Sequence, residues 1–310
     1  MNPQPTIRIG TRGSPLALAQ AEEVKSRLLA SHADLTEAAV GIEIIRTSGD
    51  RIQDKPLKEF GGKGLFTKEI EEALLAGQID LAVHSMKDVP TELPAGLGIA
   101  CLLPREDPRD AFLSPVADSL AALPAGAMVG SSSLRRVAQV RHARPDLEVV
   151  NFRGNVNTRM RKLADGEAQA TFLACAGLNR LGLADRITAA VPTEVMLPAV
   201  AQGAIGVETR DDGSAIGDYL APLHHQATAH CVAAERALLA ALEGSCRTPI
   251  AALARIDDGV LALRAQILRP DGSEMLETER SGAVADAAAM GRDAGEELRR
   301  RAGPEFFQTG

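Results

Sequence analysis

Short apolar runs rich in β-branched residues alternate with helix-like repeats over the first two hundred residues. A short apolar run bounded by turn residues favours a buried strand. Such runs are Ile7–Gly10, Ile42–Arg46, Ile79–His84, Met128–Gly130, Leu147–Phe152 and Thr171–Cys175. Alternation of strands and helices is typical of parallel sheets that carry helices on both faces. The pattern therefore predicts an α/β fold for this part of the chain.

Two of the intervening helices have clear boundaries in the sequence. The first begins at Ser14-Pro15, since serine is a good N-cap and proline suits the first helical position. Its apolar positions recur at the spacing of one helix face, at Ala17, Ala21, Val24 and Leu28. The second runs from about Thr67 to Leu75, with Ile70, Ala73 and Leu74 on the apolar face and Gly77 as the stop.

The pattern changes after Arg210, where the polar, glycine-containing segment Asp211–Gly217 indicates a boundary. A helix is predicted next, followed by three strands and a last helix: Thr228–Leu242, Ile250–Ile256, Val260–Leu268, Glu274–Glu279 and about Ala285–Arg301. Asp258-Gly259 predicts a tight hairpin between the first two strands, and Pro270-Asp271-Gly272 predicts a turn before the third. This part should form a small α+β domain, an antiparallel three-stranded sheet with helices on one face.

Composition narrows the class of protein. A chain of 310 residues with 45% hydrophobic and 24% charged residues is an ordinary globular protein of two or three domains. The net charge of −7 disfavours nucleic acid as a partner, and no apolar run is long enough to span a membrane. The N-terminal residues contain no apolar segment of the kind that signal peptides have, so we expect a cytoplasmic location.

The four cysteines form neither a CxxC motif nor a cluster with histidine, which disfavours a zinc site and a disulfide framework. Cys101 and Cys175 lie in apolar runs and Cys231 lies in a predicted helix, so packing is the expected role of all three. Cys246 lies in a polar loop beside Arg247, after the helix stop at Gly244. A reactive thiolate and an inert loop cysteine both fit that position.

Polar residues follow every predicted strand of the first two hundred residues. The segments are Thr11–Ser14, Thr47–Asp50, His84–Asp88, Ser131–Arg136, Arg153–Asn155 with Arg159 beyond it, and Ala176–Arg180. Five of the six contain an arginine or a lysine, and ligands of open α/β sheets bind at the carboxyl ends of strands. A solvated surface explains any single arginine, but it does not explain this register with the strand ends.

The strand ends favour an anionic ligand with several separate charges. Two of these turns enter helices, at Ser14 and at Ser132-Ser133, where free N–H groups and the helix dipole attract anions. Arginine adds planar, bidentate donors for carboxylate or phosphate. The sequence contains no GxxxxGK[ST] motif and no well-placed GxGxxG motif, which disfavours a nucleotide. Many separate arginines suit a ligand that has many separate carboxylates.

Asp88 is the carboxylate among the cations of its strand end, next to Lys87. It is either a turn residue that hydrogen-bonds its own backbone or a catalytic group that acts as acid, base or stabiliser of positive charge. The polar segment Asp50–Gly64, which contains Lys63, is either a lid over an anionic site or a plain surface loop. Phe66 suits stacking on a flat ring, and a helix-start core residue is the alternative.

Together these motifs resemble the porphobilinogen deaminase family, also called hydroxymethylbilane synthases. The resemblance rests on TRGSPLALAQA from Thr11, GGKGLFTKEIE from Gly61, DLAVHSMKDVP from Asp80, GSSSLRR from Gly130, NFRGNVNTR from Asn151, AGLNRLG from Ala176, QGAIGVETR from Gln202 and EGSC from Glu243. These segments cover nearly the whole chain and occur in the family's order. Ser245 is a departure, because the family often has glycine there.

The resemblance implies two doubly wound domains like those of periplasmic binding proteins, which flank a cleft, and a small third domain that carries a cofactor cysteine. Domain 1 would comprise residues 1–103 and 204–221, domain 2 residues 104–203, and domain 3 residues 222–310. The periodicity of the sequence alone does not show the return of the chain into domain 1.

The resemblance also implies the activity. The family joins four porphobilinogen molecules head to tail into linear hydroxymethylbilane and releases ammonia, in the biosynthesis of tetrapyrroles such as haem. Its cofactor is a dipyrromethane made from the substrate and held by a thioether bond, which would attach at Cys246. Asp88 would assist the loss of ammonia and stabilise positive charge on the pyrrole nitrogens. The family tends to be monomeric and needs no metal ion.

The remaining site residues are carried over from the family's motifs. Those implied for the carboxylates of the cofactor are Ser85, Lys87, Ser132, Ser133, Arg135, Arg136 and Arg159. Those implied for the substrate and the growing chain are Arg12, Ser14, Lys63, Phe66, Arg153, Arg180 and Gln202. An acetate and a propionate on each ring would explain the number of cations.

Two other functions compete with this interpretation. A non-catalytic, two-lobed anion-binding protein would explain the arginines, but it would not explain the C-terminal domain with its loop cysteine. A nucleic-acid-binding regulator fits less well, because the net charge is negative and aromatic residues are scarce.

Overall fold

The computed structural model describes residues 7–48, 67–244 and 248–308, and within them the chain forms two compact units. The first unit contains the described residues up to Arg105 together with Ala204–Ala229. The second contains Glu106–Gly203 and the described residues from His230 onward. The chain therefore leaves the first unit once and returns to it. The predicted division into three domains stays a prediction.

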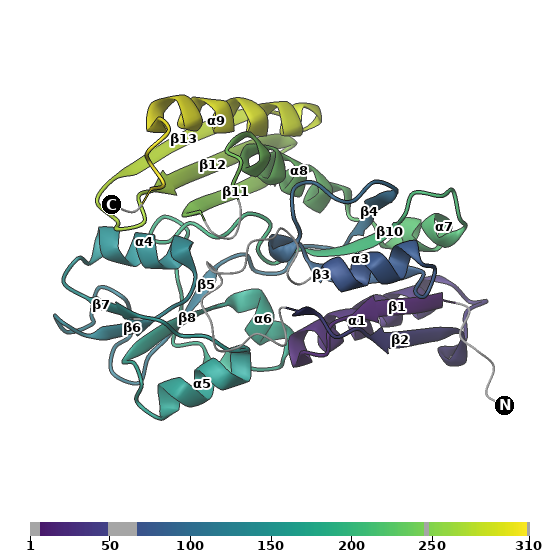
Figure 1. Cartoon of the computed structure of the whole chain (residues 1–310), viewed down its shortest axis with the longest axis horizontal. Coiled ribbons are helices and arrows are strands. Elements are labelled where there is room, and N and C mark those ends of the chain that lie inside the picture. Colours follow the sequence, from purple (N-terminus) through teal and green to yellow (C-terminus); the bar gives the residue numbers. More distant parts are fainter. Residues whose placement is uncertain (1–6, 49–66, 245–247, 309–310) are drawn as a thin grey trace. The chain divides into compact units, whose positions relative to one another are not determined.

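The first unit is built on a five-stranded sheet with helices on both faces (Figure 1). The strand order is β2-β1-β3-β10-β4, with bounds β1 Ile7–Thr11, β2 Val40–Ile44, β3 Leu81–Ser85, β4 Leu97–Leu102 and β10 Ile205–Arg210. Its helices are α1 Pro15–Ser31, α3 Lys68–Leu75 and α7 Ile216–Leu220, with short 3₁₀ turns η1 Glu37–Ala39, η3 Met86–Asp88 and η5 Ala221–Leu223.

Alternation along β3 explains why both faces of this sheet are covered. Val83 points into a core that α1 supplies with Ala21, Val24 and Leu28. Ala82 points to the other face, into a core that α3 supplies from its own apolar stripe. Successive side chains of a strand point to opposite faces, so a strand buried on both sides reads as a continuous apolar run. Both helices confirm the sequence prediction, including the glycine stop at Gly77, which has φ +66°.

The second unit contains another five-stranded sheet, of order β7-β6-β8-β5-β9. Its strands are β5 Asp110–Leu113, β6 Met128–Gly130, β7 Glu148–Val150, β8 Ala170–Ala174 and β9 Ala189–Ala190. Helix α4 Leu134–Ala143 packs on the face of Phe112 and Phe172, whereas α5 Val156–Ala164 and α6 Cys175–Arg180 pack on the other face. A 3₁₀ turn, η4, spans Ala184–Arg186.

The expectation of parallel sheets is corrected, because both sheets are mixed. β10 runs antiparallel to β3 and to β4, and β5 runs antiparallel to β8 and to β9. For β10 the cause is the return of the chain into the first unit, because a strand that re-enters a sheet after a long excursion is free to enter from the opposite end. β4, β5, β9 and β10 were not predicted as strands. The second predicted strand is observed two residues earlier, at Val40–Ile44.

The C-terminal part of the second unit is the predicted α+β layer. Strands β11 Ile250–Asp257, β12 Val260–Leu268 and β13 Met275–Ala283 form an antiparallel sheet. The helices are α8 Gln226–Ala241, whose first four residues belong to the first unit, and α9 Ala287–Ala302, with a 3₁₀ turn η6 Val284–Asp286 before it. Figure 1 shows α9 running along β12 and β13 at the yellow end of the chain. The hairpin at Asp258-Gly259 is confirmed, with φ values of +49° and +77°.

Candidate active site

The carboxyl ends of β1 and β3 surround a small polar hollow of about 60 Å³ in the first unit. Seven polar side chains line it. Four belong to predicted site residues, namely Arg12, Ser14, Ser85 and Asp88, and three do not, namely Gln20, Thr67 and His84. Two elements start here, α1 directly after β1 and η3 directly after β3. The sequence prediction that polar residues gather at strand ends is confirmed for this pair of strands.

The amino end of α1 favours an anion in this hollow. Ser14 caps the helix, with its Oγ accepting from Ala17 N–H at 3.3 Å, and Pro15 takes the first helical position. The first turn contains no acidic residue that would neutralise the positive end of the helix dipole. The half-buried guanidinium of Arg12 adds a full positive charge beside it. The arrangement suits a carboxylate.

Asp88 lies across the hollow on the one-turn helix η3. The turn is anchored by the buried side chains of Met86 and Val89 and by a hydrogen bond from Val89 N–H to Met86 O of 3.2 Å. Gly206 of β10 makes room for it, because a Cβ at this position would come within 2.1 Å of Met86 Sδ. The carboxylate itself is half-buried and has neither a hydrogen bond nor an ion pair to the described residues. It is therefore open to a ligand.

Gln20 is a residue of the hollow that we did not predict. It is buried, and its Nε2 donates to Ser85 Oγ at 2.8 Å. This bond orients a serine hydroxyl at the end of β3. A signal was present in the sequence, because Gln20 is a polar residue that adjoins Ala17 and Ala21 on the otherwise apolar face of α1.

Arg135 and Arg136 occupy the first turn of α4 in the second unit, and both bind the same buried carboxylate. Arg135 Nη1 donates to Asp110 Oδ2 at 2.7 Å, and Arg136 Nη2 donates to Asp110 Oδ1 at 2.6 Å. All three side chains are buried. Although burial opposes ionisation of Asp110, the two guanidiniums hold the pKa of this carboxyl well below its usual range. Burial in turn lowers the pKa of Arg136.

This cluster of Asp110, Arg135 and Arg136 keeps one positive charge in excess and some unused donors. Each arginine makes three hydrogen bonds to protein acceptors out of its five N–H groups, the other acceptors being Leu197 O and Phe172 O. The Nε of Arg135 is buried without a hydrogen-bond partner among the described residues. Such a donor fits the carboxylate of a ligand. Asp110 was not predicted, because β5 was not recognised as a strand.

Gln202 and two serines complete the surroundings of this cluster. Gln202 Nε2 donates to Asp110 Oδ1 at 3.1 Å and to Pro108 O at 2.8 Å, so it also positions the carboxylate. Ser133 caps α4, with its Oγ accepting from Arg136 N–H at 3.5 Å. Ser132 Oγ donates to Asn151 Oδ1 at 2.7 Å. The predicted turn at Ser132-Ser133 therefore lies at the amino end of α4, just as Ser14 lies at the amino end of α1 in the first unit.

The other predicted cations of the second unit are less buried. Arg153 and Arg159 are half-buried, and Arg159 Nε donates to Gly154 O at 2.8 Å. Arg180, at the end of α6, donates to Gly203 O at 3.1 Å. Arg180 thus contacts the backbone just before the chain returns to the first unit. No role in ligand binding follows from these bonds alone.

The predicted site residues thus fall into two sets, one in each unit. The first unit contains Arg12, Ser14, Ser85, Lys87 and Asp88. The second contains Ser132, Ser133, Arg135, Arg136, Arg153, Arg159, Arg180 and Gln202. Lys63, Phe66 and Cys246 lie outside the described residues.

Three cysteines behave as predicted. Cys101, Cys175 and Cys231 are free thiols and all three are buried. Burial raises the pKa of Cys101 to about 11 and that of Cys175 to about 12, so neither forms a thiolate near neutral pH.

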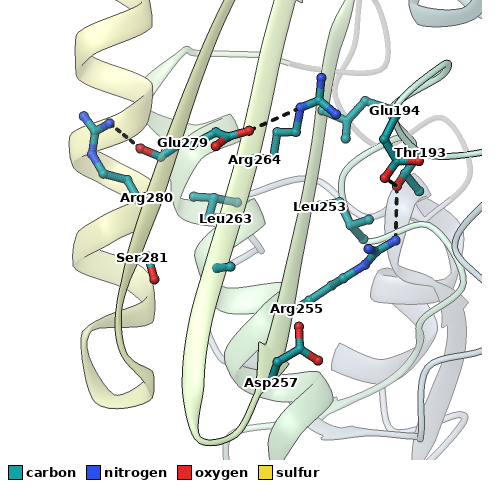
Figure 2. A pocket seen from close by; sticks show the side chains of 12 residues that line it. Thr193, Glu194, Leu253, Arg255, Asp257, Leu263, Arg264, Glu279, Arg280 and Ser281 are labelled. Atoms are coloured by element: carbon teal, nitrogen blue, oxygen red, sulfur yellow. Dashed lines mark hydrogen bonds and ion pairs between the residues drawn. The ribbon is translucent and has the colours of Figure 1, made fainter.

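A second and larger hollow, of about 420 Å³, lies on the C-terminal sheet of the second unit (Figure 2). Its three arginines already have protein partners. Arg255 bonds Thr193 at 3.1 Å, Arg264 lies 3.6 Å from Glu279, and Arg280 pairs with Glu297 of α9 at 2.6 Å. It contains none of the predicted site residues. Size alone therefore does not identify the functional site. The smaller hollow is the better candidate, because it contains the predicted site residues and the carboxylate of Asp88.

Within the described ranges, no helix is long and apolar enough to cross a membrane, and no three His, Cys, Asp or Glu side chains are grouped to hold a metal ion.

Two family models match the chain in sequence. Residues 7–218 match the model described as "Porphobilinogen deaminase, dipyromethane cofactor binding domain", and residues 229–300 match "Porphobilinogen deaminase, C-terminal domain". Between the two matches lie residues 219–228, which include the start of α8.

Curated relatives match over nearly the full length. The porphobilinogen deaminase of Paracoccus denitrificans is 59% identical over 306 residues, which cover 99% of this chain and 97% of the relative. That of Nitrobacter winogradskyi is 58% identical and covers 96% and 94%. A chloroplastic porphobilinogen deaminase of Oryza sativa is 56% identical and covers 98% of this chain and 86% of the relative.

Solved structures with a similar shape are more distant. A periplasmic substrate-binding protein of an ABC transporter from Coxiella burnetii is 15% identical, with a TM-score of 0.43 over 72% of this chain and 94% of that chain. A putative periplasmic sulfonate-binding protein from Methylobacillus flagellatus is 15% identical, with a TM-score of 0.37 over 74% and 66%. Because both scores are low, the α/β fold class rests on the strand orders above. By its sequence matches over nearly its full length, the chain belongs to the porphobilinogen deaminase family.

Proposed function

We propose that this protein joins four porphobilinogen molecules head to tail into hydroxymethylbilane and releases ammonia, as a transferase of tetrapyrrole biosynthesis. Membership of the family supports the reaction. The observation that carries the assignment to a site is the carboxylate of Asp88, which is half-buried in a polar hollow and has no partner among the described residues. A non-catalytic anion-binding role is not favoured, because such a role needs no unpaired carboxylate among cations.

Asp88 is the proposed catalytic residue. Loss of ammonia from the aminomethyl group of the substrate builds positive charge on the pyrrole ring, and a fixed carboxylate next to that ring stabilises this charge. The surroundings strengthen the effect, because partial burial removes water that would screen the carboxylate. The anchored η3 turn keeps the carboxylate in place, so little reorganisation is needed during the reaction.

The cations of the first unit are proposed to bind the carboxylates of the substrate. Arg12 and the amino end of α1 at Ser14 supply a full and a partial positive charge on one side of the hollow. Lys63 and Phe66 are proposed to contact the substrate as well, on the strength of the family's motif alone. In the second unit, Arg153, Arg180 and Gln202 are proposed to bind the growing chain.

The second unit has residues that fit the family's dipyrromethane cofactor. The cluster of Asp110, Arg135 and Arg136 keeps a net positive charge and the unpartnered Nε of Arg135, and Ser133, the N-cap of α4, adjoins it. We propose that Ser132, Ser133, Arg135, Arg136 and Arg159, with Ser85 and Lys87 of the first unit, bind its carboxylates. Cys246 is the proposed attachment point. When bound, the cofactor supplies the free α-carbon to which the first substrate is joined.

We further propose that the protein acts as a monomer in the cytoplasm, without nucleic acid, membrane or metal ion. The division into three domains, at residues 103/104, 203/204 and 221/222, belongs to the same proposal. Separate family matches for residues 7–218 and 229–300 support a distinct C-terminal domain.

Intact-protein mass spectrometry combined with an assay for hydroxymethylbilane tests this function. The purified protein should carry the added mass of two linked pyrroles and should convert porphobilinogen into hydroxymethylbilane with release of ammonia. The Cys246→Ser variant should lack both the added mass and the activity, and Cys231→Ser is a control in which both remain. An unmodified wild-type protein, active or not, would overturn the proposal.

A further inference from the structure

A buried polar cluster lies next to the Asp88 hollow and has no role in the reaction described so far. It consists of His84 from β3, Glu208 from β10 and Glu71 from α3, in the layer between the sheet and that helix. His84 Nε2 donates to Glu208 Oε2 at 2.9 Å, and both side chains are almost fully buried. His84 also lines the hollow that contains Asp88.

The register of the sheet explains how the pair forms. Gly206 lies opposite His84, and Glu208 lies opposite Ala82, so the two polar side chains share one face and meet diagonally. The last pair of the ladder is Ser85 with Ile205, after which Met86 N–H donates to Ala204 O at 3.0 Å. His84 is therefore the last residue of β3 whose side chain is held by β10 before the Asp88 turn begins.

Burying this polar cluster lowers the stability of the fold. Glu208 Oε1 is buried without a hydrogen-bond partner among the described residues, and a buried carboxylate oxygen without a partner is destabilising. Burial raises the pKa of Glu71, and the nearby Glu208 acts in the same direction. Apolar residues of similar volume would fill such a layer at no loss of stability. Stability is thus a poor reason for the pair.

We propose that His84, held by Glu208, is a positioning residue that fixes the end of β3 and thereby the Asp88 turn. The bond ties the side chain of His84 to the neighbouring strand β10, in addition to the backbone hydrogen bonds between the two strands. Ser85, which is hydrogen-bonded to Gln20, and Asp88 then leave β3 in a fixed direction. Misplacement of a reacting group by about 1 Å costs on the order of a hundredfold in rate, so a loosened turn would slow the reaction. This inference rests on the proposed function of Asp88.

The test removes both polar groups at once. In the double variant His84→Phe/Glu208→Leu the layer stays apolar and filled, so the protein should fold and load its cofactor. We expect kcat to fall about tenfold or more, while KM for porphobilinogen and the cofactor mass stay unchanged. Glu208→Gln keeps an acceptor for His84 and should restore kcat to within about threefold of wild type. Glu72→Gln, at an exposed carboxylate of the same helix α3, leaves the buried cluster intact and serves as the control.

A second measurement does not depend on activity. Hydrogen exchange at the amides of Met86 and Val89 should be about tenfold faster in the double variant and unchanged in Glu72→Gln, because the turn opens more often when its anchor is lost. Wild-type exchange at these amides in the double variant would overturn the inference, as would wild-type kcat. If the wild-type protein failed to consume porphobilinogen, the proposed function would fall, and the exchange rates would still decide the positioning role.

Discussion

The amino ends of α1 and α4 look alike in sequence and differ in what they do with a carboxylate. Each follows a strand of its own sheet, begins at a serine N-cap and has no acidic residue in its first turn. Near α4, Asp110 is fully buried and binds two arginines. Near α1, Asp88 is half-buried and has no partner among the described residues.

The difference distinguishes a carboxylate that stabilises the fold and orients arginines, Asp110, from a carboxylate that is available to a reacting ligand, Asp88. A carboxylate that two guanidiniums already satisfy stabilises the fold and orients its arginines, but it has little left to offer a reacting ring. A carboxylate without a protein partner, kept among cations by an anchored turn, is stabilised by a ligand that develops positive charge. The first unit thus contains the group for the reaction, and the second contains groups that bind anions.

Replacing Asp88 should have the largest effect on turnover. In Asp88→Asn the volume and the turn are kept and the negative charge is lost, so kcat should fall by about 10²–10⁴-fold. The melting temperature should stay near that of wild type, because Asp88 makes no hydrogen bond or ion pair to the described residues. Steady-state assays and thermal unfolding measure the two quantities. Glu22→Gln, an exposed carboxylate of α1, is the matched control with unchanged kcat, and normal turnover in Asp88→Asn would refute the catalytic role.

Replacing Asp110 should affect stability most. Asp110→Asn leaves two buried guanidiniums without their counter-ion, and breaking such a buried network costs about 3–5 kcal/mol of unfolding free energy. Urea unfolding measures this loss. The control is Asp146→Asn, which breaks an exposed pair with Arg144 of 2.6 Å and should cost at most about 1 kcal/mol. Equal losses in the two variants would mean that burial does not distinguish these pairs.

The same carboxylate predicts a dependence on pH. The pKa of Asp110 is held below its unfolded value by Arg135 and Arg136, against the effect of burial. Its contribution to stability is therefore complete above the unfolded pKa of about 3.9 and is lost as the pH falls below that value towards the native pKa. Between about pH 5 and pH 3, wild-type protein should lose more stability than Asp110→Asn does. If the unfolding free energies of the two proteins fell in parallel over this range, Asp110 would not be the source of the pH dependence.

The two helix caps should give the smallest effects. Ser14 Oγ accepts from Ala17 N–H at 3.3 Å, and Ser133 Oγ accepts from Arg136 N–H at 3.5 Å. Each serine-to-alanine change should cost about 1 kcal/mol of unfolding free energy. If the amino end of α1 binds substrate, Ser14→Ala should also raise KM for porphobilinogen, whereas Ser133→Ala should leave KM unchanged. Equal KM values in both variants would remove Ser14 from the substrate site.

Much of this arrangement is visible in the sequence, because it depends on local patterns. The apolar stripe of α1, the serine caps and the Asp258-Gly259 hairpin each depend on neighbouring residues, and all are observed as predicted. Polar residues at strand ends were also foreseen, since the carboxyl ends of parallel strands share an edge.

What the sequence did not reveal depends on partners far apart in the chain. β10 was missed, because its place between β3 and β4 follows from the return of the chain and not from its own pattern. Asp110 is paired with residues 25 and 26 positions away, so no local signal marks it as the counter-ion. His84 finds Glu208 at a separation of 124 residues. Only the fold distinguishes the paired aspartate from the open one.

The mass of the Asp88→Asn protein before and after exposure to porphobilinogen tests the central claim most directly. This variant should carry covalently bound pyrroles as purified, because the groups proposed to bind the cofactor are intact. Its mass should then stay constant on addition of porphobilinogen, whereas the mass of wild-type protein should increase in steps of one pyrrole. Stepwise growth in Asp88→Asn would contradict the account, since chain extension would then not require the open carboxylate.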